Sequence, residues 1–435
     1  MDKLCFRISF MIVVISLLMF AQSALAQLGE SEATVGNDFG VGARAMGMGG
    51  AFIGVADDSS ALYWNPGGLS QIRRMEFFAA LSHEKFETAT DYFGSSASTF
   101  ASNTEPNSFT IVLPVPVYRG GLAFALGVNR LQSFDSRIRF KGFNESSVAE
   151  NPDFGQLFVD ETFNESGGIY SWSFGVAAEI APDLSLGGSL DFLSGGYLME
   201  FKSDVDDTEE LDEVLTGFSF RDSIEPDYFG VDGRIGILAH PIPQIRLGAT
   251  VTIPLDFSVD EYWSQETFEV YDDGTDYSSS DDGVFHYDIS RPPRFGGGIS
   301  VSPVPGAMVA ADVLYTDWTQ TKYSEPPSEE ISNEDFLEDY RSTFQLRVGG
   351  EYTIPGVGLS IRGGYMLDPR SYDPEYIEID TDRQFVTVGI GMIMAEVLSL
   401  DLAYVRGFWD ESTTDEVIKK NMDINRVFLS ALYKF

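Results

Sequence analysis

Four arginines lie on one face of segments in which apolar and polar residues alternate, and their side chains are suited to binding an anion. A guanidinium can hold a carboxylate through two parallel hydrogen bonds. Most charges on this face should pair with one another, because a buried charge without a partner is costly. An arginine that remains available can receive the carboxylate of a ligand, and the candidates are Arg234, Arg246, Arg347 and Arg362.

Residues suited to catalysis are sparse. His83, His240 and His286 fall in or beside different predicted strands, with no nucleophile motif and no metal-ligand spacing around them. The glycines at 47–50 have the composition of a phosphate-binding loop, yet no predicted strand precedes them. We therefore expect a protein that is not an enzyme and that holds no metal or cofactor.

The elements that position these residues are strands, because apolar residues recur at every second position in fourteen segments. In residues 244–257, isoleucine, leucine, alanine, valine and phenylalanine alternate with polar residues or glycine over most of the segment. A symmetric turn at 355–358 would place Glu351 opposite Ser360 and diagonal to Arg362. The predicted strands are 74–84, 107–115, 121–133, 169–181, 184–195, 227–239, 243–257, 285–301, 306–318, 343–353, 358–366, 384–395, 398–409 and 424–435.

The connections between these segments alternate between short turns rich in proline and glycine and long polar loops. Outer-membrane barrels have short periplasmic turns and long external loops. The last segment, 424–435, ends on Phe435 and has the length and alternation of a closing membrane strand. The pattern predicts an all-β fold, a monomeric 14-stranded antiparallel transmembrane β-barrel, with long loops at 85–106, 134–168, 196–226, 258–284, 319–342, 367–383 and 410–423.

The start of the chain and its charge indicate an exported protein. Residues 1–26 carry basic residues, an apolar run and Ala24-Leu25-Ala26, in the order of a cleaved signal peptide. The chain has 28 basic and 67 acidic residues and a formal charge of −39, which argues against nucleic acid as a partner. Its only cysteine, Cys5, lies within the predicted signal peptide.

A glycine-rich stretch at 40–70 separates the signal peptide from the first strand and is unsuited to a membrane strand or a regular helix. Within it, GARAMGMGGAFIGVADDSSALYWNPGGLS resembles the N-terminal hatch of the FadL-type outer-membrane transporters of long-chain fatty acids and other hydrophobic compounds. The resemblance implies a hatch at 27–72 inside a barrel at 73–435, ligand entry from outside, and sideways exit at a kink in the third strand. Where the family has Asn-Pro-Ala, this chain has Asn65-Pro66-Gly67.

The hatch residues also make sense from their chemistry. Pro66 fixes its own backbone and favours an extended Asn65, whose side chain can close a local turn. Two acidic residues can tether the segment through backbone amides or an arginine, and two aromatic residues can touch an apolar ligand. All of them could equally serve only to keep the segment folded. The hatch candidates are Asp57, Asp58, Tyr63, Trp64, Asn65, Pro66 and Gly67.

The sequence thus predicts passive uptake of hydrophobic small molecules, such as long-chain fatty acids, across the outer membrane of a diderm bacterium. The expected partners are the ligand, outer-membrane lipid and the barrel-assembly machinery. One alternative stays open, a PorV-like docking protein of type 9 secretion, because such proteins share this barrel family and a similar start followed by Asn-Pro.

Overall fold

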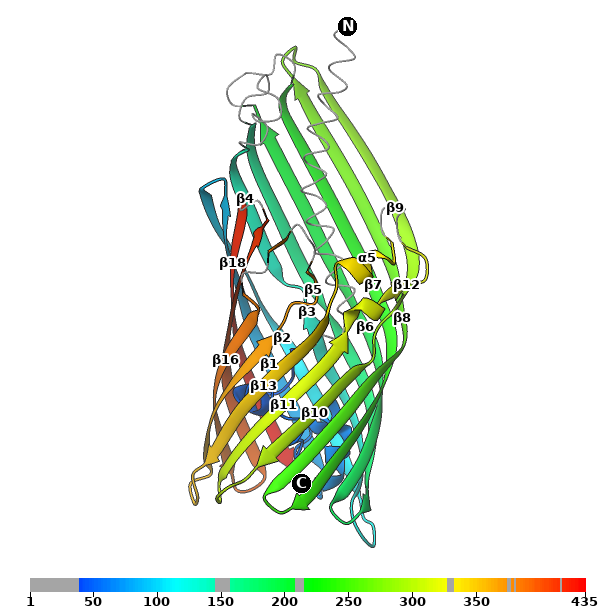
Figure 1. The fold of residues 1–435 in the computed structure, drawn as a ribbon, viewed down its shortest axis with the longest axis vertical. Coiled ribbons are helices and arrows are strands. Elements are labelled where there is room, and N and C mark those ends of the chain that lie inside the picture. The colour runs from blue at the N-terminus through cyan, green and yellow to red at the C-terminus, as the bar shows by residue number, and fades with distance from the viewer. Residues whose placement is uncertain are drawn as a thin grey trace.

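The strands form one closed antiparallel barrel (Figure 1). The computed structural model describes residues 39–144, 157–207, 215–326, 332–373, 377–378, 381–414 and 417–435. The wall closes where β1 (Glu76–Tyr92) pairs with β18 (Ile418–Lys434), from Glu76 opposite Lys434 to Tyr92 opposite Ile418. Among the described residues, no helix is both long and apolar enough to span a membrane.

Four strands of the wall are interrupted and carry two labels each. Counted once each, they give the described part of the chain the fourteen strands that the sequence predicts. The interrupted strands are β3 (Leu122–Ser133) with β4 (Ser136–Asn144), β9 (Asp276–Ser290) with β10 (Arg294–Val301), β11 (Ala307–Asp317) with β12 (Lys322–Tyr323), and β15 (Ile377–Glu378) with β16 (Arg383–Met394), both of which pair with β17 (Leu398–Thr413); β14 (Leu359–Asp368) is continuous. The others are β2 (Ser95–Val115), β5 (Leu157–Ala181), β6 (Leu184–Asp206), β7 (Leu215–Ile242), β8 (Ile245–Tyr271), β13 (Ser342–Thr353) and β17. Two short helices, η3 (Trp318–Gln320) and α5 (Asp335–Glu338), lie between β11 and β13.

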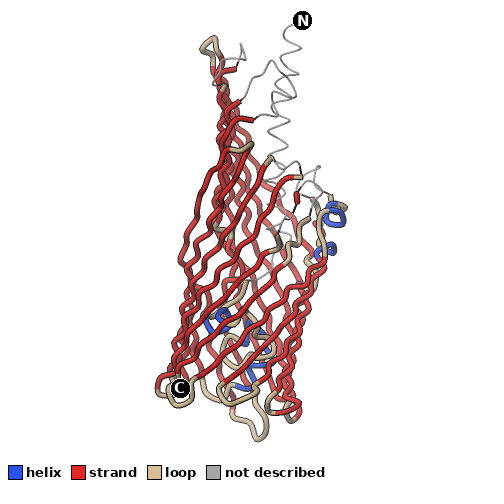
Figure 2. Tube along the Cα trace, turned by 60° about the vertical axis from the view of Figure 1, so that its left-hand side comes forward, coloured by secondary structure: helices blue, strands red, loops and turns tan. Residues whose placement is uncertain are grey.

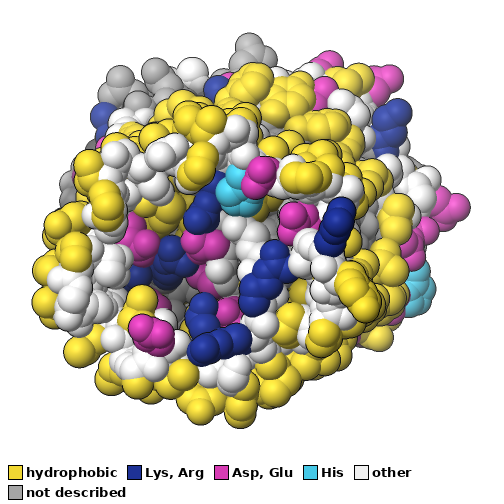
Figure 3. Space-filling model, turned by 90° about the horizontal axis from the view of Figure 1, so that it is seen from below, with side chains coloured by type: hydrophobic (Ala, Val, Ile, Leu, Met, Phe, Trp, Pro, Cys, Tyr) yellow, Lys and Arg dark blue, Asp and Glu magenta, His cyan; other side chains and the backbone are white. Residues whose placement is uncertain are grey.

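The outer face of the wall is apolar along its lower part. On β8, Leu247, Ile253 and Leu255 are 45%, 42% and 61% exposed, whereas Thr252 between them is buried. The view from below shows apolar side chains around the circumference (Figure 3). A closed barrel with an apolar outer face suits lipid, because every strand has a partner and no sheet edge is left open.

Several segments predicted as long loops are strands. The 85–106 region forms the upper parts of β1 and β2, joined by a tight turn at Phe93 and Gly94, and the 258–284 region belongs to β8 and β9. The prediction stopped where apolar alternation stopped. The outer face of these strand ends is largely polar, although Phe86, Tyr92 and Val259 are buried on the other face, and backbone ladders hold the strands together, so a search for a lipid-facing apolar face could not reveal them.

Residues 39–72, here called the lumen segment, lie inside the lower half of the barrel (Figure 2). The segment contains α2 (Ala43–Gly47), α3 (Ala61–Trp64) and the 3₁₀ helix η1 (Pro66–Gln71). Most of its apolar side chains are fully buried, including Met46, Met48 and Phe52. The predicted signal peptide and the first part of the predicted hatch, residues 27–38, lie outside the described residues.

Glycines of the wall allow the lumen segment to approach the strands closely. A Cβ atom on Gly349 would come closer than 3.0 Å to the Met48 carbonyl, and one on Gly248 would meet the Ile53 carbonyl in the same way. Equivalent close approaches involve Gly121, Gly187, Gly236, Gly298 and Gly364. Inward glycines therefore shape the wall to this segment, backbone against backbone.

Candidate functional site

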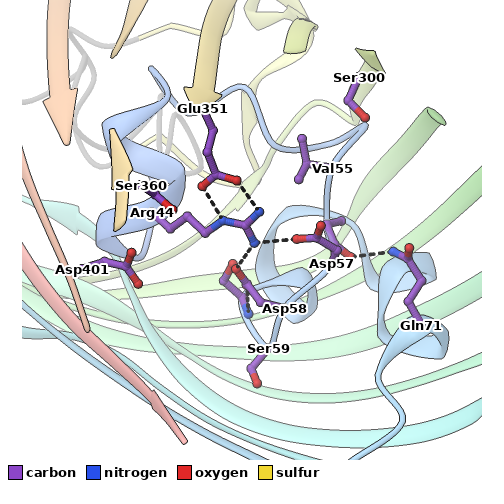
Figure 4. Close-up of polar contacts among 12 residues, drawn as sticks. Arg44, Val55, Asp57, Asp58, Ser59, Gln71, Ser300, Glu351, Ser360 and Asp401 are labelled. Carbon is purple, nitrogen blue, oxygen red and sulfur yellow. Dashed lines mark hydrogen bonds and ion pairs between the residues drawn. The ribbon is translucent and has the colours of Figure 1, made fainter. Parts of the chain in front are cut away.

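Arg44 of α2 is the centre of a charged network (Figure 4). The view from below shows basic and acidic side chains gathered in the mouth of the barrel (Figure 3). Its guanidinium donates two hydrogen bonds, of 3.0 and 3.1 Å, to the Glu351 carboxylate on β13. It also donates to Asp57 at 2.6 Å and to Asp58 at 3.1 Å. One arginine thus joins the start of the lumen segment, its middle and the wall.

Asp57 links this network to a second strand, since Arg246 of β8 donates to its other carboxylate oxygen at 2.9 Å. Burial acts to raise the pKa of Asp57, but Arg44 and Arg246 outweigh burial and hold the pKa well below its ordinary value. Burial acts to lower the pKa of Arg44, and the charges of Asp57, Glu351 and Asp58 raise it instead. Both groups therefore stay ionised at neutral pH.

Higher in the lumen, Asp312 of β11 binds the backbone of the segment. Its carboxylate accepts hydrogen bonds from the amides of Phe52 and Ile53 at 2.6 and 2.7 Å. Such bonds satisfy two buried N–H groups that have no partner in regular secondary structure. Three further wall side chains accept hydrogen bonds from the segment's amides, on Asn107, Thr387 and Ser430. The Ser300 hydroxyl instead donates to the Gly54 carbonyl at 2.9 Å.

The Asn65-Pro66-Gly67 turn begins η1 and holds it to β7. The Asn65 side chain accepts from the Gly67 amide at 3.0 Å and donates to the carbonyls of Ile53 and Ile237 at 2.9 and 3.0 Å. Pro66 follows it at the first position of the helix, where its missing N–H costs nothing. A Cβ on Gly67 would press against the Gly236 carbonyl, which gives a physical reason for glycine at this position.

Tyr63 and Trp64 lie beside two of the predicted arginines. Their rings meet edge to face, with centroids 4.9 Å apart. The guanidinium of Arg234 lies 5.3 Å from the Tyr63 ring centre, and that of Arg347 lies 5.2 Å from the Trp64 ring centre. Arg234 also donates to the Tyr63 carbonyl. These contacts are the favourable stacking of a cation on an aromatic face.

A cavity with a volume of about 60 Å³ lies between these aromatic rings and the wall, several times the ~10–15 Å³ that one water needs. Ile53, Tyr63 and Trp64 of the lumen segment line one side of it. Its other lining residues, as far as the structure describes them, include no carboxylate: Arg234, Thr250, Arg294, Leu314, Thr316, Thr343, Gln345 and Arg347.

The four predicted arginines separate into two groups. Arg234 and Arg347 line the cavity, whereas Arg246 and Arg362 belong to the charged network below it. Arg362 donates to Glu351 at 2.6 Å and to Asp401 at 2.7 Å. The predicted register of this hairpin is wrong: Glu351 lies directly opposite Arg362, and Ser360 lies opposite Thr353, which is the pairing that a symmetric turn at 355–358 gives.

Three residues of the site were missed by sequence reasoning. Arg44 lies in the recognised glycine-rich stretch, and it is the only arginine or lysine there. Asp312 lies in the predicted strand 306–318, but its partners are backbone amides that no sequence pattern reveals. Arg294 follows two prolines at the start of β10, where the break in the strand shifts which residues point inward.

Comparison with known proteins shows likeness at the level of structure. No protein-family model and no curated protein sequence matches the chain. The toluene transporter TodX of Pseudomonas putida superposes with a TM-score of 0.66 at 16% identity, over 91% of this chain and 99% of that one. A Pseudomonas aeruginosa FadL homologue does so with a TM-score of 0.59 at 15% identity, over 92% and 100%. The fold is that of the FadL-type transporters.

A third solved structure extends this likeness. The toluene transporter TbuX of Ralstonia pickettii superposes with a TM-score of 0.58 at 14% identity, over 92% of this chain and 99% of that one. This FadL-type fold confirms the resemblance read from the hatch sequence and the predicted barrel. At such low identity it is the architecture that is shared, so the ligand must be argued from the residues of this chain.

Proposed function

We propose that this chain is an outer-membrane transporter that passively carries hydrophobic small molecules with an acidic group, such as long-chain fatty acids, through a barrel plugged by residues 27–72. It carries out no catalysis in this proposal. The solved structures of similar fold include transporters named for toluene, which supports an apolar cargo. Action as a monomer, and assembly by the barrel-assembly machinery, remain predictions.

The cavity above the lumen segment carries the proposal. Its aromatic side, Tyr63 and Trp64, suits an apolar body, and three guanidiniums, on Arg234, Arg294 and Arg347, suit a carboxylate. Arg234 and Arg347 have partners in the structure, so a ligand carboxylate would replace or join contacts that these side chains already make. An amphipathic acid fits this lining better than a neutral hydrocarbon does.

The third strand offers a route sideways. β2 pairs with β3 only from Val115 opposite Leu122 up to Ser108 opposite Asn129. Above that level β3 shifts register at Arg130 to Gln132 and gives way to β4, which pairs with β5 and, among the described residues, forms no ladder with β2. Exposed Phe109, Leu126 and Trp172 lie on the outer face of these strands. We propose this seam as the exit that the resemblance implies.

Uptake of radiolabelled oleate and toluene, in cells that lack other such transporters, tests the proposal. Arg347→Gln removes one charge-assisted contact of about 1.5–3 kcal/mol, so we expect the half-saturation concentration for oleate to rise by about tenfold or more. Toluene uptake should stay unchanged. Arg406→Gln is the matched control, because Arg406 pairs with Asp423 at an exposed position of β17.

Three outcomes would change the conclusion. Equal loss of oleate and toluene uptake in Arg347→Gln would mean that the arginine supports the fold and does not receive a carboxylate. Uptake of toluene alone would restrict the cargo to hydrocarbons. Wild-type protein that takes up neither compound but retains secretion components on purification would replace transport with the docking function.

A further inference from the structure

The wall has a second interruption, far from the third strand. β8 pairs with β9 from Ser258 opposite Asp288 upward, and with β10 from Thr252 opposite Arg294 downward. Between these stretches, residues 253–257 and 289–293 form no ladder with each other. Five residues on each strand lie between the two ladders, so the same register continues above and below the break. At ~3.3 Å per residue, the unpaired stretch is roughly 20 Å long.

Prolines explain the break. Pro254 lies on β8 and Pro292 and Pro293 lie between β9 and β10, at facing heights. None of them can donate to a ladder, and proline in a sheet is normally confined to edges and bulges. The β7–β8 ladder also shifts register here, where Asp232 faces Pro254 and Val231 faces Asp256. Three prolines thus separate two neighbouring strands in the middle of a wall.

The other side of the same strand is interrupted at the same height. β10 pairs with β11 up to Arg294 opposite Thr316, and β9 meets β12 at Ser290 opposite Lys322. The short helix η3 lies between these two pairings on the neighbouring strand. In the described structure, residues 291–293 therefore have no ladder partner on either side.

Apolar side chains flank this gap inside and outside. Phe257, Ile289 and Trp318 are buried, at 1%, 3% and 2% exposure. On the outer face, Leu255 is 61% exposed and Phe295 is 50% exposed. A hydrophobic molecule moving outward at this point would pass from apolar side chains to lipid.

One ion pair crosses the gap on the inside. The Arg291 guanidinium binds the Asp232 carboxylate at 2.6 Å, and the two side chains are 2% and 3% exposed. The guanidinium also lies 4.4 Å from the centre of the Phe257 ring on β8. Arg291 thereby ties the unpaired linker to β7 across the intervening strand.

The cavity lies directly beneath this gap. Arg294 and Thr316, which line the cavity, form the last β10–β11 pair below it. Arg234, another lining residue, donates to Thr252, the last β8 residue paired with β10, at 3.2 Å. No residue of β2, β3 or β4 lines the cavity. The bound ligand would therefore be nearer to this interruption than to the third strand.

We propose that this interruption is a second side passage, through which a hydrophobic molecule leaves the cavity for the surrounding lipid, and that Arg291 bound to Asp232 holds it shut. The inference rests on the proposed transport function. It assigns to the proline-lined gap between β8 and β9/β10 a role separate from that of the seam at the third strand.

Reversible cross-linking tests the passage. Asp256 and Ser290 are exposed and face each other within the gap, so Asp256→Cys/Ser290→Cys can be joined by a short bifunctional methanethiosulfonate reagent and released by dithiothreitol. Tyr262→Cys/Val284→Cys is the matched control, because these exposed residues are ladder partners above the gap. Mass spectrometry confirms each cross-link before oleate uptake is measured in whole cells.

We expect the cross-link within the gap to reduce oleate uptake by at least half, with recovery after dithiothreitol, and the control cross-link to leave uptake unchanged. Uptake that is equal in the joined and released forms would overturn the passage. Absence of uptake in the released form as well as in wild type would instead overturn the transport function. Asp232→Asn/Arg291→Gln, which removes both charges together, should raise uptake above wild type; unchanged uptake would overturn the role of Arg291.

Discussion

The two interruptions of the wall differ in how they are bounded and how they are closed. The seam at the third strand is paired below Ser108 and Asn129 and has no ladder between β2 and β4 above that level. The gap between β8 and β9/β10 is paired both above and below. The first is therefore a stretch where backbone pairing ends and β4 contacts β2 through side chains, as where the Thr99 hydroxyl donates to the Arg137 carbonyl, and the second is a window within an otherwise continuous ladder.

Each interruption contains a buried Arg–Asp pair, but in different surroundings. At the third strand, Asp135 accepts hydrogen bonds from Arg130, Asn103 and Ser133. At the window, Asp232 binds Arg291, whose guanidinium stacks on Phe257. A carboxylate that accepts from three side chains tolerates the loss of one contact better than a buried carboxylate whose ion pair is with one guanidinium. The window should therefore depend more strongly on one ion pair than the seam does.

The largest expected effect is a difference in stability between variants of the two Arg–Asp pairs. Asp232→Ala leaves the Arg291 charge buried without its carboxylate and should lower the free energy of unfolding by ~3–5 kcal/mol. Asp135→Ala should cost less, about 1–2 kcal/mol, because Arg130 still donates to the Gly167 carbonyl. Urea unfolding in detergent micelles, followed by tryptophan fluorescence, measures both. Equal losses would contradict the distinction between the two aspartates.

The two interruptions also differ in how well the sequence predicts them. Pro292 and Pro293 stand inside the predicted strand 285–301, and proline in the middle of a wall strand is itself a sign of a break. The alternation of apolar residues continues on both sides, which is why one unbroken strand was predicted. At the third strand the break occurs at Phe134 and Asp135, which carry no such sign. It depends on tertiary contacts that the sequence does not display.

In the barrel and in the site as well, the sequence predicts some features and not others. Alternation predicts the strands of the apolar belt because lipid selects one face of each, and it fails above the belt, where the outer face is largely polar. The hatch motif predicts that Asn65 closes a local turn, since this contact spans only two residues. The contacts of Arg44 with Glu351 and of Asp312 with Phe52 join residues far apart in sequence. Such contacts depend on the register of the strands. An error of two residues in the predicted register placed Glu351 opposite Ser360 when it lies opposite Arg362.

Both interruptions lie in the wall that surrounds the lumen segment. A variant that weakens the contacts of this segment should therefore affect transport whichever interruption is the exit. Asn65→Ala removes three hydrogen bonds, two of which join Asn65 to Ile53 and to β7. It should lower the free energy of unfolding by about 2 kcal/mol. We expect a higher single-channel conductance in planar bilayers, with or without the cross-link between residues 256 and 290. Ser70→Ala is a control that removes one hydrogen bond within η1 and one to Ser185 of β6, and leaves the contacts with Ile53 and β7 intact. A rise in conductance that the cross-link abolished would tie the lumen segment to the window alone.

The smallest expected effect concerns pH. Arg44 and Arg246 hold the pKa of Asp57 below its ordinary value of about 3.9. A carboxyl whose pKa is lowered by folding contributes stability that is fully present above its unfolded pKa and is lost only as the pH falls through the lowered value. Between pH 8 and pH 5 the anchor at Asp57 should therefore not change. Asp57→Asn should raise conductance by the same factor at pH 8 and at pH 5, whereas Asp273→Asn, in the exposed turn between β8 and β9, should have no effect on it. A ratio of variant to wild-type conductance that fell toward one at pH 5 would show that Asp57 already takes up a proton there, and that Arg44 and Arg246 do not hold its pKa down.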